Sequence, residues 1–300
     1  MLGLQSSSRG ILALSICVTA LGGCAHSQGT SGESAQSPAP SPSETAAPLP
    51  GEPPAPTGVE TKEVTYASGP TQLKGFIAYP ARTDKRPGVL VVHEWWGHNE
   101  HARRSATRLA EMGYVALAVD MYGDGKLAGH PDDAKKFMME VMGNAQEGAK
   151  RFEAARALLA ADPRTDADKI AAIGYCMGGA IVLNMARTGS DLDAVASFHG
   201  NLAAQQPMKP NAFAGKILVA HGGADPFVPP EQVEAFKKEM DAASAKYDLV
   251  VYPGAKHGFT NPEATENGKK FSIPIEYNAQ ADAESWQKLQ QLLAEVWPAT

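Results

Sequence analysis

From residue 59 onward the chain alternates short apolar strands with amphipathic helices, and this alternation limits the folds that it can adopt. A strand that is apolar along its whole length is buried on both faces, as in a parallel sheet between two layers of helices. We therefore expect one α/β domain with a mainly parallel central sheet, opened by an antiparallel pair of strands around Gly69-Pro70. Strands are expected at 60–66, 72–79, 89–92, 114–120, 169–175, 193–199, 216–221 and 248–253, and helices at 101–113, 132–143, 145–161, 177–187, 230–240 and 284–297.

The first 23 residues have the pattern of an export signal. Arg9 precedes an apolar run at 11–20 that is short for a membrane span and ends in small residues. The run leads to Leu21-Gly22-Gly23-Cys24, which resembles the lipobox of bacterial lipoproteins, where cleavage precedes a cysteine that receives lipid. We predict a signal peptide at 1–23 and an exported lipoprotein held by Cys24 on a cell-envelope membrane, at the periplasmic or outer-membrane face. A plain secretory signal is the other interpretation.

Residues 24–58 are predicted to form a disordered tether between this anchor and a folded domain at 59–300. The segment is rich in Pro, Ser, Gly and Ala and contains no aromatic residue, so it cannot bury enough apolar surface to fold. Beyond Cys24 the chain has one further cysteine, Cys176, so the domain cannot form an internal disulfide. An unpaired thiol in an exported domain is either buried by accident or required for function.

Charge argues against a nucleic-acid partner. The net charge is −6, and lysines and arginines are scattered rather than clustered or interleaved with aromatic residues. The only membrane contact expected is the lipid anchor. The oligomeric state stays open, with a monomer as the default expectation.

Loops at the carboxyl ends of parallel strands carry the chemistry of such folds, and three of them contain reactive side chains. Cys176 lies in Gly174-Tyr175-Cys176-Met177-Gly178-Gly179, directly between a strand and a helix. This is the form of a nucleophile elbow, in which small neighbours permit a tight turn and the helix start offers free N–H groups to an oxyanion. The alternative is a buried structural cysteine beside a glycine-rich helix start.

Two later loops favour the nucleophile. Asp225 follows the strand at 216–221, and His257 follows the strand at 248–253. Each residue alone has an ordinary explanation, as a turn former or a surface histidine. A nucleophile, an acid and a histidine in this chain order, each just past a strand, form the pattern of the α/β-hydrolase triad.

The motifs HEWWG, DMYG, GYCMGG, ADPFVP and GAKHGF together resemble the dienelactone hydrolase family, the cysteine branch of the α/β-hydrolase fold, across residues 59–300. The resemblance implies Cys176 as nucleophile, His257 as general base and acid, and Asp225 as the residue that orients the imidazole. It also implies that the backbone N–H groups of Trp95 and Met177 form the oxyanion hole. No cofactor is implied.

The stretch VLVVHEWWGHNEH raises the alternative of a metal site. His93 and His98 are five positions apart, which on a helix separates the imidazoles by about 140°, whereas the four-residue spacing of the zinc motif gives about 40°. The segment also follows a strand directly, so no metal is expected. The resemblance instead implies that Glu94 hydrogen-bonds the Cys176 thiol and helps to activate it, while His93, His98 and His101 have solvated or supporting roles.

One departure from the family pattern concerns the substrate. The resemblance implies a serine after the catalytic histidine and an arginine in the region before it, which together grip a substrate carboxylate, but here Gly258 follows His257. Lys135 and Lys136 are candidate carboxylate contacts, and a solvated charged face is the other interpretation of this pair. The sequence therefore leaves open whether the substrate is dienelactone itself or a different small ester or lactone.

The sequence thus predicts a membrane-tethered carboxylic ester hydrolase that opens small esters or lactones through a thioester intermediate. The contrasting hypothesis is a surface lipoprotein that retains the hydrolase fold as a binding module, without catalysis.

Overall fold

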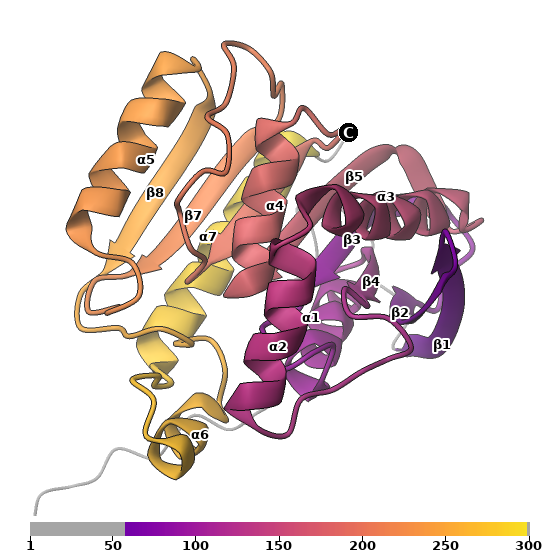
Figure 1. Cartoon of the computed structure of the whole chain (residues 1–300). Helices are drawn as coiled ribbons and strands as arrows, with labels where there is room; N and C mark the ends of the chain where they lie inside the picture. Colours follow the sequence, from indigo (N-terminus) through magenta and orange to yellow (C-terminus); the bar gives the residue numbers. More distant parts are fainter. Residues whose placement is uncertain (1–57, 299–300) are drawn as a thin grey trace, which may run out of the picture. The chain divides into compact units, whose positions relative to one another are not determined.

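An eight-stranded sheet forms the centre of the computed structural model, which describes residues 58–298 (Figure 1). The strand order is β1-β2-β4-β3-β5-β6-β7-β8. β1 and β2 pair antiparallel, as do β2 and β4, and every other neighbouring pair is parallel. This confirms the α/β fold class. The strands are β1 Val59–Ser68, β2 Thr71–Pro80, β3 Arg86–Val92, β4 Val115–Val119, β5 Thr165–Tyr175, β6 Ala194–Phe198, β7 Lys216–Gly222 and β8 Lys246–Tyr252.

Helices cover both faces of the sheet, as the apolar strands predict (Figure 1). One face packs against α2, α3, α4 and α5, and the opposite face packs against α1 and α7. The helices are α1 Glu100–Glu111, α2 Pro131–Met142, α3 Ala145–Ala161, α4 Met177–Arg187, α5 Pro230–Ala242, α6 Ala264–Phe271 and α7 Ala279–Val296. The sequence interpretation did not include α6.

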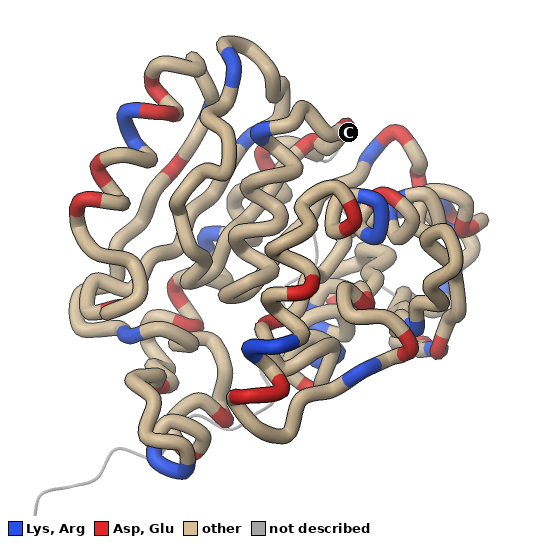
Figure 2. Tube along the Cα trace, viewed as in Figure 1, with Lys and Arg blue, Asp and Glu red and all other residues tan. Residues whose placement is uncertain are grey.

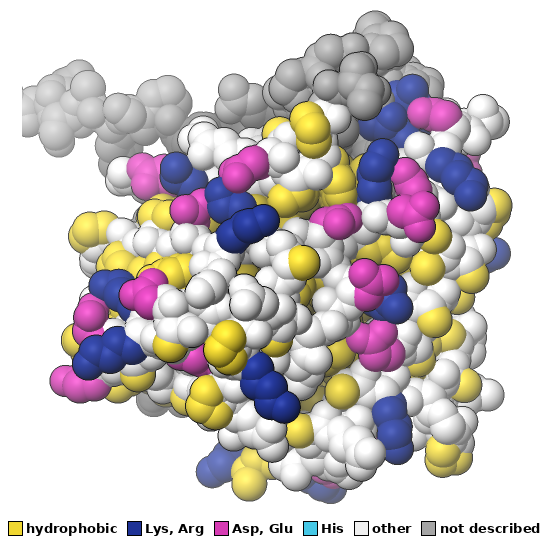
Figure 3. Space-filling model, turned by 90° about the horizontal axis from the view of Figure 1, so that it is seen from above, with side chains coloured by type: hydrophobic (Ala, Val, Ile, Leu, Met, Phe, Trp, Pro, Cys, Tyr) yellow, Lys and Arg dark blue, Asp and Glu magenta, His cyan; other side chains and the backbone are white. Residues whose placement is uncertain are grey.

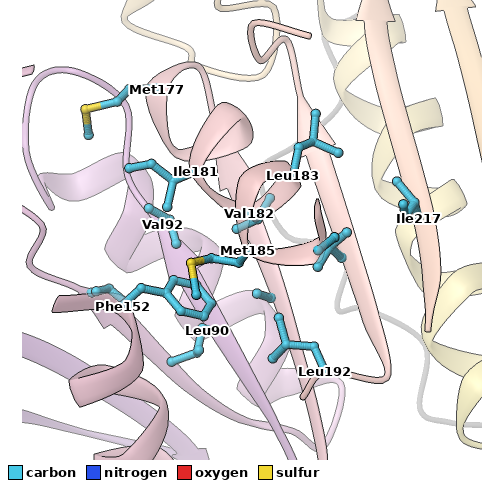
Figure 4. Packing of buried hydrophobic residues seen from close by; sticks show 14 of the residues in the cluster. Leu90, Val92, Phe152, Met177, Ile181, Val182, Leu183, Met185, Leu192 and Ile217 are labelled. Carbon is cyan, nitrogen blue, oxygen red and sulfur yellow. The ribbon is translucent and has the colours of Figure 1, made fainter. Parts of the chain in front are cut away.

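The core has two parts because the sheet separates them. On one side, Leu90 of β3 packs near Phe152 of α3 and Met185 of α4 (Figure 4). On the other side, Leu109 of α1 and Leu289 of α7 belong to the second buried cluster. β3 to β7 are therefore buried on both faces along most of their length, which accounts for their continuous apolar sequences.

The strand order reverses around β3, which lies between β4 and β5 although it precedes both in the chain. In an open parallel sheet such a reversal leaves a crevice at the carboxyl ends of the strands, where ligands bind. The segments that leave β3, β4 and β5 at this edge are HEWWG, DMYG and GYCMGG. Three of the sequence motifs therefore meet at one place.

Charge is dispersed over the described surface. Basic and acidic residues alternate along the outer helices (Figure 2), and the face seen from the top of Figure 1 mixes both charges with small hydrophobic groups (Figure 3). No helix within 58–298 combines the length and apolarity that a bilayer span requires. The predicted signal peptide at 1–23, Cys24 and all but the last residue of the predicted tether at 24–58 lie outside the described residues.

Candidate active site

Cys176 lies at the tight turn between β5 and α4. Its backbone has φ 53° and ψ −114°, a conformation that costs energy for any residue with a side chain and that is found at functional turns. The Cys176 N–H donates to the carbonyl of Phe198 at 3.0 Å, which fixes the turn against β6. The side chain is half-buried and is the one free cysteine within residues 58–298.

Asp225 and His257 come together from the loops that follow β7 and β8. The His257 Nδ1 lies 2.8 Å from Asp225 Oδ2, and the Asp225 carboxylate is buried. Its other oxygen accepts the Phe227 N–H at 2.8 Å, so the loop backbone orients the carboxylate. The Asp225 side chain therefore selects the His257 tautomer that carries a proton on Nδ1 and leaves Nε2 for chemistry.

His257 also contacts the Cys176 thiol. Burial alone lowers the pKa of His257, but the charge of the Cys176 thiolate and the hydrogen bonds to Asp225 and Cys176 raise that pKa to about 10. The imidazolium is thus stabilised by a negative group on each side. The structure brings the three predicted triad residues into one connected arrangement of nucleophile, base and acid.

Aromatic rings enclose the imidazole. His199 contacts His257 edge-on with ring centroids 5.2 Å apart, and Phe227 contacts it at 5.1 Å from the solvent side. His199 is fully buried, and its Nε2 lies 2.8 Å from the Thr260 hydroxyl. Burial first, and then the charge of His257, lowers the pKa of His199 well below its ordinary value, so this ring is neutral beside the catalytic pair. Phe227 is 47% exposed and forms an apolar wall at the mouth of the site.

Glu94 is buried next to this cluster. Its Oε2 accepts a 2.6 Å hydrogen bond from the Asn261 amide, and His101 Nδ1 lies 4.0 Å from the same oxygen. Burial raises the pKa of Glu94 to about 7, although the Asn261 hydrogen bond and the charge of His257 oppose the rise. Within residues 58–298 the thiol of Cys176 bonds to His257 and not to Glu94. The hydrogen bond between Glu94 and the thiol that the resemblance implies is therefore absent from this conformation.

The three histidines of this stretch, His93, His98 and His101, are buried, which excludes the solvated role and leaves the supporting role that was the other expectation for them. His93 Nδ1 donates to the Glu94 carbonyl, and His93 Nε2 accepts the Met121 N–H at 3.2 Å. His101 Nε2 donates to the Thr260 carbonyl at 3.1 Å. Desolvation lowers the pKa of all three, most strongly for His93, to about 4, and for His101, to about 3.

No group of three or more metal-ligating side chains is arranged around a common point within the described part of the chain. Both ring nitrogens of His93 are already engaged by backbone groups.

The backbone N–H groups of Met177 and Trp95 are candidate donors to an oxyanion. Met177 is the first residue of α4, so its N–H has no partner inside the helix. Neither the Met177 N–H nor the Trp95 N–H has an acceptor among residues 58–298. The Tyr122 hydroxyl lies between these two residues, donating to the Trp95 carbonyl at 2.8 Å and lying 3.6 Å from the Met177 sulfur.

Lys135 and Lys136 are exposed on α2, and neither contacts the triad. They line an open surface depression with other residues of the same helix, Asp132, Met139 and Glu140. The exposure of Lys135 and Lys136 agrees with the interpretation that they belong to a solvated charged helix face rather than to a carboxylate-binding site. The contact of α2 with the site region is instead made by the partly buried Phe137, whose ring lies 5.4 Å from that of Tyr122.

Sequence reasoning missed four polar residues that line or support the site: Tyr122, His199, Thr260 and Asn261. Each directly follows a recognised strand or motif, in DMYG, SFHG and GAKHGFTN. The position of His199 and Tyr122 at the ends of strands was the sequence feature that could have identified them as site residues. Nothing in the sequence pairs Asn261 with Glu94, which lies 167 positions earlier.

Comparison with known proteins identifies relatives over the described domain. The sequence model of the dienelactone hydrolase family matches residues 73–297. A Yersinia pestis protein whose name, carboxymethylenebutenolidase, is provisional is 28% identical over 244 residues, covering 77% of this chain and 87% of its own. A Salmonella typhimurium protein with the same provisional name is 31% identical, covering 68% of this chain and 82% of its own.

Solved structures agree with the sequence relatives. The crystal structure of a dienelactone hydrolase-like promiscuous phosphotriesterase from metagenomic libraries superposes with a TM-score of 0.75 at 33% identity. The match covers 79% of this chain and 98% of that one. More distant structures of peptidases, at 13% to 17% identity, share the fold alone.

Proposed function

The chain belongs to the dienelactone hydrolase family, and we propose that it hydrolyses small esters or lactones through a thioester formed on Cys176. The observation that carries the proposal is the connected arrangement of Cys176, His257 and Asp225 at the carboxyl ends of β5, β8 and β7. A nucleophile, a base in contact with it and a carboxylate that orients the base are the parts that acyl transfer requires.

In the first half of the reaction the Cys176 sulfur attacks the ester carbonyl carbon. A C–S bond forms, the carbonyl π electrons move onto oxygen, and the thiol proton resides on His257 Nε2. Collapse of the tetrahedral intermediate breaks the C–O bond to the leaving alcohol, which takes the proton from His257. The acyl group then remains on Cys176 as a thioester.

Water completes the cycle. His257 takes a proton from a water molecule as its oxygen attacks the thioester carbonyl, and breaking the C–S bond releases the carboxylic acid and restores the thiol. Asp225 balances the imidazolium charge in both halves of the reaction because it holds Nδ1 throughout. The N–H groups of Trp95 and Met177 are the proposed donors to the oxyanion.

Glu94 is proposed to assist activation of the thiol. In the described conformation its carboxyl group is bonded to Asn261, so it would have to shift toward Cys176 when substrate binds. There it could accept the thiol proton and transfer it to His257 Nε2, after which His257 would complete acyl transfer. A pKa raised by burial to about 7 suits a group that exchanges a proton near neutral pH.

Uncharged esters are the substrate class that the site favours. Negative charges lie beside the reacting groups: those of Cys176 and Asp225 raise the pKa of His257, and that of Glu263 raises the pKa of Glu94. A substrate carboxylate would thus meet these negative charges together with the His257 imidazolium that they balance, so no uncompensated cation attracts it. The exposed ring of Phe227 offers an apolar contact to the substrate instead.

The decisive experiment combines one substitution with a matched pair of esters. We expect the purified protein to hydrolyse p-nitrophenyl acetate, Cys176→Ala to reduce the rate to background, and stoichiometric iodoacetamide to have the same effect. The carboxylate-bearing p-nitrophenyl hemisuccinate should be hydrolysed with a lower kcat/KM than its neutral counterpart. Hydrolysis that persists after full alkylation of Cys176 would refute the nucleophile, and absence of hydrolysis across an ester and lactone panel would favour a binding module.

A further inference from the structure

The segments HEWWG and DMYG, which leave β3 and β4, are joined by buried contacts that the reaction steps above do not use. His93 and Tyr122 are both buried, and their rings meet edge-on with centroids 4.8 Å apart. Both side chains direct polar atoms at the backbone around Trp95. Trp95 carries one of the two N–H groups proposed to hold the oxyanion.

His93 fixes the peptide group between Glu94 and Trp95. Its Nδ1 donates to the Glu94 carbonyl, and the Gly97 N–H donates to the same oxygen at 3.3 Å. In a planar trans peptide the carbonyl and the following N–H point in opposite directions. Holding the Glu94 carbonyl on one side therefore aims the Trp95 N–H to the other side.

The orientation of His93 is itself determined by the backbone of the DMYG segment. His93 Nε2 accepts the Met121 N–H at 3.2 Å, which leaves the proton on Nδ1, where it is donated to Glu94. Desolvation lowers the pKa of His93 to about 4, so the ring is neutral at neutral pH and keeps one donor and one acceptor. A protonated ring would lose the acceptor and the Met121 contact.

Tyr122 fixes the next peptide group. Its hydroxyl donates to the Trp95 carbonyl at 2.8 Å, and the same hydroxyl lies 3.6 Å from the Met177 sulfur. Burial, with a smaller effect from the charge of Cys176, raises the pKa of Tyr122, so the hydroxyl stays a donor. The two peptide groups on either side of the Trp95 α-carbon are thus held by different side chains.

Asp120 fixes the backbone of the DMYG segment, which carries Met121 and Tyr122. Its carboxylate is fully buried and accepts four backbone N–H groups, those of Lys74, Tyr122, Gly123 and Gly125, at 2.8 to 3.0 Å. These bonds fold the segment after β4 into a compact turn, which places the Met121 N–H and the Tyr122 ring. The first residue of DMYG thus sets the positions of the two residues that follow it.

We infer that His93 and Tyr122 are positioning residues that clamp the peptide groups flanking Trp95 and so hold its N–H in place as an oxyanion donor. The inference rests on the proposed function, because it assigns these residues to the oxyanion hole of that reaction. The clamp acts where charge develops in the transition state, so it contributes to kcat and little to substrate binding.

Tyr122→Phe is the first test, because it removes the hydroxyl and keeps the ring. We expect kcat for p-nitrophenyl acetate to fall by about 10- to 100-fold, less than the 10²–10³-fold typical of removing an oxyanion donor outright, with KM nearly unchanged. A trifluoromethyl ketone, which forms a tetrahedral adduct with the thiol, should bind more weakly by a similar factor. Alkylation of Cys176 by iodoacetamide, which generates no oxyanion, should proceed at close to the parent rate.

Two substitutions of His93 test the contributions of its two ring nitrogens separately. Asn can place an amide donor near the position of Nδ1, whereas Gln can place an acceptor near the position of Nε2 and leaves the Glu94 carbonyl without its donor. We expect His93→Asn to retain more of kcat than His93→Gln. Thermal unfolding of each variant shows that it is folded before its kinetics are compared.

Tyr114→Phe is the matched control, since it removes a buried tyrosine hydroxyl at the opposite end of β4 and should hydrolyse esters at the parent rate. Parent kcat in Tyr122→Phe would overturn the clamp, as would equal losses of hydrolysis and alkylation, which would indicate damage to the thiol. Either result is distinguishable from failure of the proposed function, in which Cys176→Ala itself would still hydrolyse esters.

Discussion

At the scale of single residues, burial of the Glu94 carboxyl group couples its charge to the stability of the fold. It is 5% exposed, and its pKa is raised by burial from 4.5 to about 7. Between these two pH values the folded protein holds a proton that the unfolded chain releases. The free energy of unfolding should therefore fall as pH rises through this window and level off above it.

Glu94→Gln should remove this dependence, because a neutral amide has no proton to lose. We expect the parent to lose roughly 3 kcal/mol, relative to Glu94→Gln, between about pH 4.5 and pH 8. Urea unfolding of both proteins at several pH values measures the difference, in which the titration of groups that do not interact with Glu94 cancels. A difference between the two proteins that stays constant with pH would show that Glu94 has an ordinary pKa.

The same variant tests the proposed role of Glu94 in catalysis. If Glu94 accepts the thiol proton, hydrolysis by Glu94→Gln should fall by roughly 10²–10⁴-fold, as for loss of a general base. Iodoacetamide should react faster with Cys176 in the variant at neutral pH, because a nearby carboxylate no longer repels the thiolate. Parent rates in both assays would leave Glu94 a structural residue bonded to Asn261.

The triad residues could be predicted from the sequence because each lies within a few residues of the end of a strand, and the carboxyl ends of neighbouring parallel strands lie at the same edge of the sheet. The partners of these residues could not be predicted in the same way. The bond between Asn261 and Glu94, and that between His199 and Thr260, join positions 167 and 61 residues apart with no pattern that links them. The sequence left a solvated and a supporting role open for His93, His98 and His101, because polarity alone does not distinguish an exposed histidine from a buried one with backbone partners.

At the scale of elements, the turn between β5 and α4 depends on close backbone approach. A Cβ on Gly178 would lie 2.2 Å from the Val92 carbonyl oxygen, and one on Gly174 would lie 2.1 Å from the Gly178 carbonyl oxygen. The start of α4 therefore packs directly on the end of β3, with no room for a side chain. This packing brings the Met177 N–H and the segment of Trp95 to the same side of the nucleophile.

Gly178→Ala should consequently be severely destabilising. Because the clash is with backbone atoms of a central strand, neither side can move cheaply, and we expect a loss of about 3 kcal/mol or more in the free energy of unfolding. Gly129→Ala is the control, since a Cβ there meets nothing within 4 Å. Urea unfolding of the two variants should show a large loss for the first and almost none for the second. Similar midpoints would mean that the elbow tolerates a side chain.

The other strands and helices were predictable because their apolar periodicity is strong, whereas α6 was not. Its eight residues, ATENGKKF, contain two apolar side chains, Ala264 and Phe271, and its first turn has no capping side chain. The chain just after α6 is held instead by backbone contacts with the loop of His257, namely a bridge between His257 and Ile275 and a bond from the Glu276 N–H to the His257 carbonyl. Helix formation here is a consequence of docking near the site rather than of local sequence.

At the scale of the whole molecule, the described domain accounts for the chemistry, and the first 57 residues carry a separate prediction about location. Cys24 follows Leu21-Gly22-Gly23, and the composition of the segment beyond it predicts a tether. A lipid on Cys24 would hold the enzyme at a membrane while the chain up to residue 58 allows the site to meet soluble esters. Anchoring and catalysis are then separable properties of one chain.

Cys24→Ala should separate them. We expect this variant to lose lipid labelling and to be released from the membrane fraction or left unprocessed, because the residue that is cleaved and lipidated is gone, while kcat/KM for p-nitrophenyl acetate is unchanged. Cys17→Ala is the matched control: Cys17 lies within the apolar run at 11–20, which the signal peptidase would remove, so its loss should leave lipid labelling and membrane retention intact. Lipid labelling and membrane retention of Cys24→Ala equal to those of Cys17→Ala would rule out the lipoprotein anchor and favour a plain secretory signal.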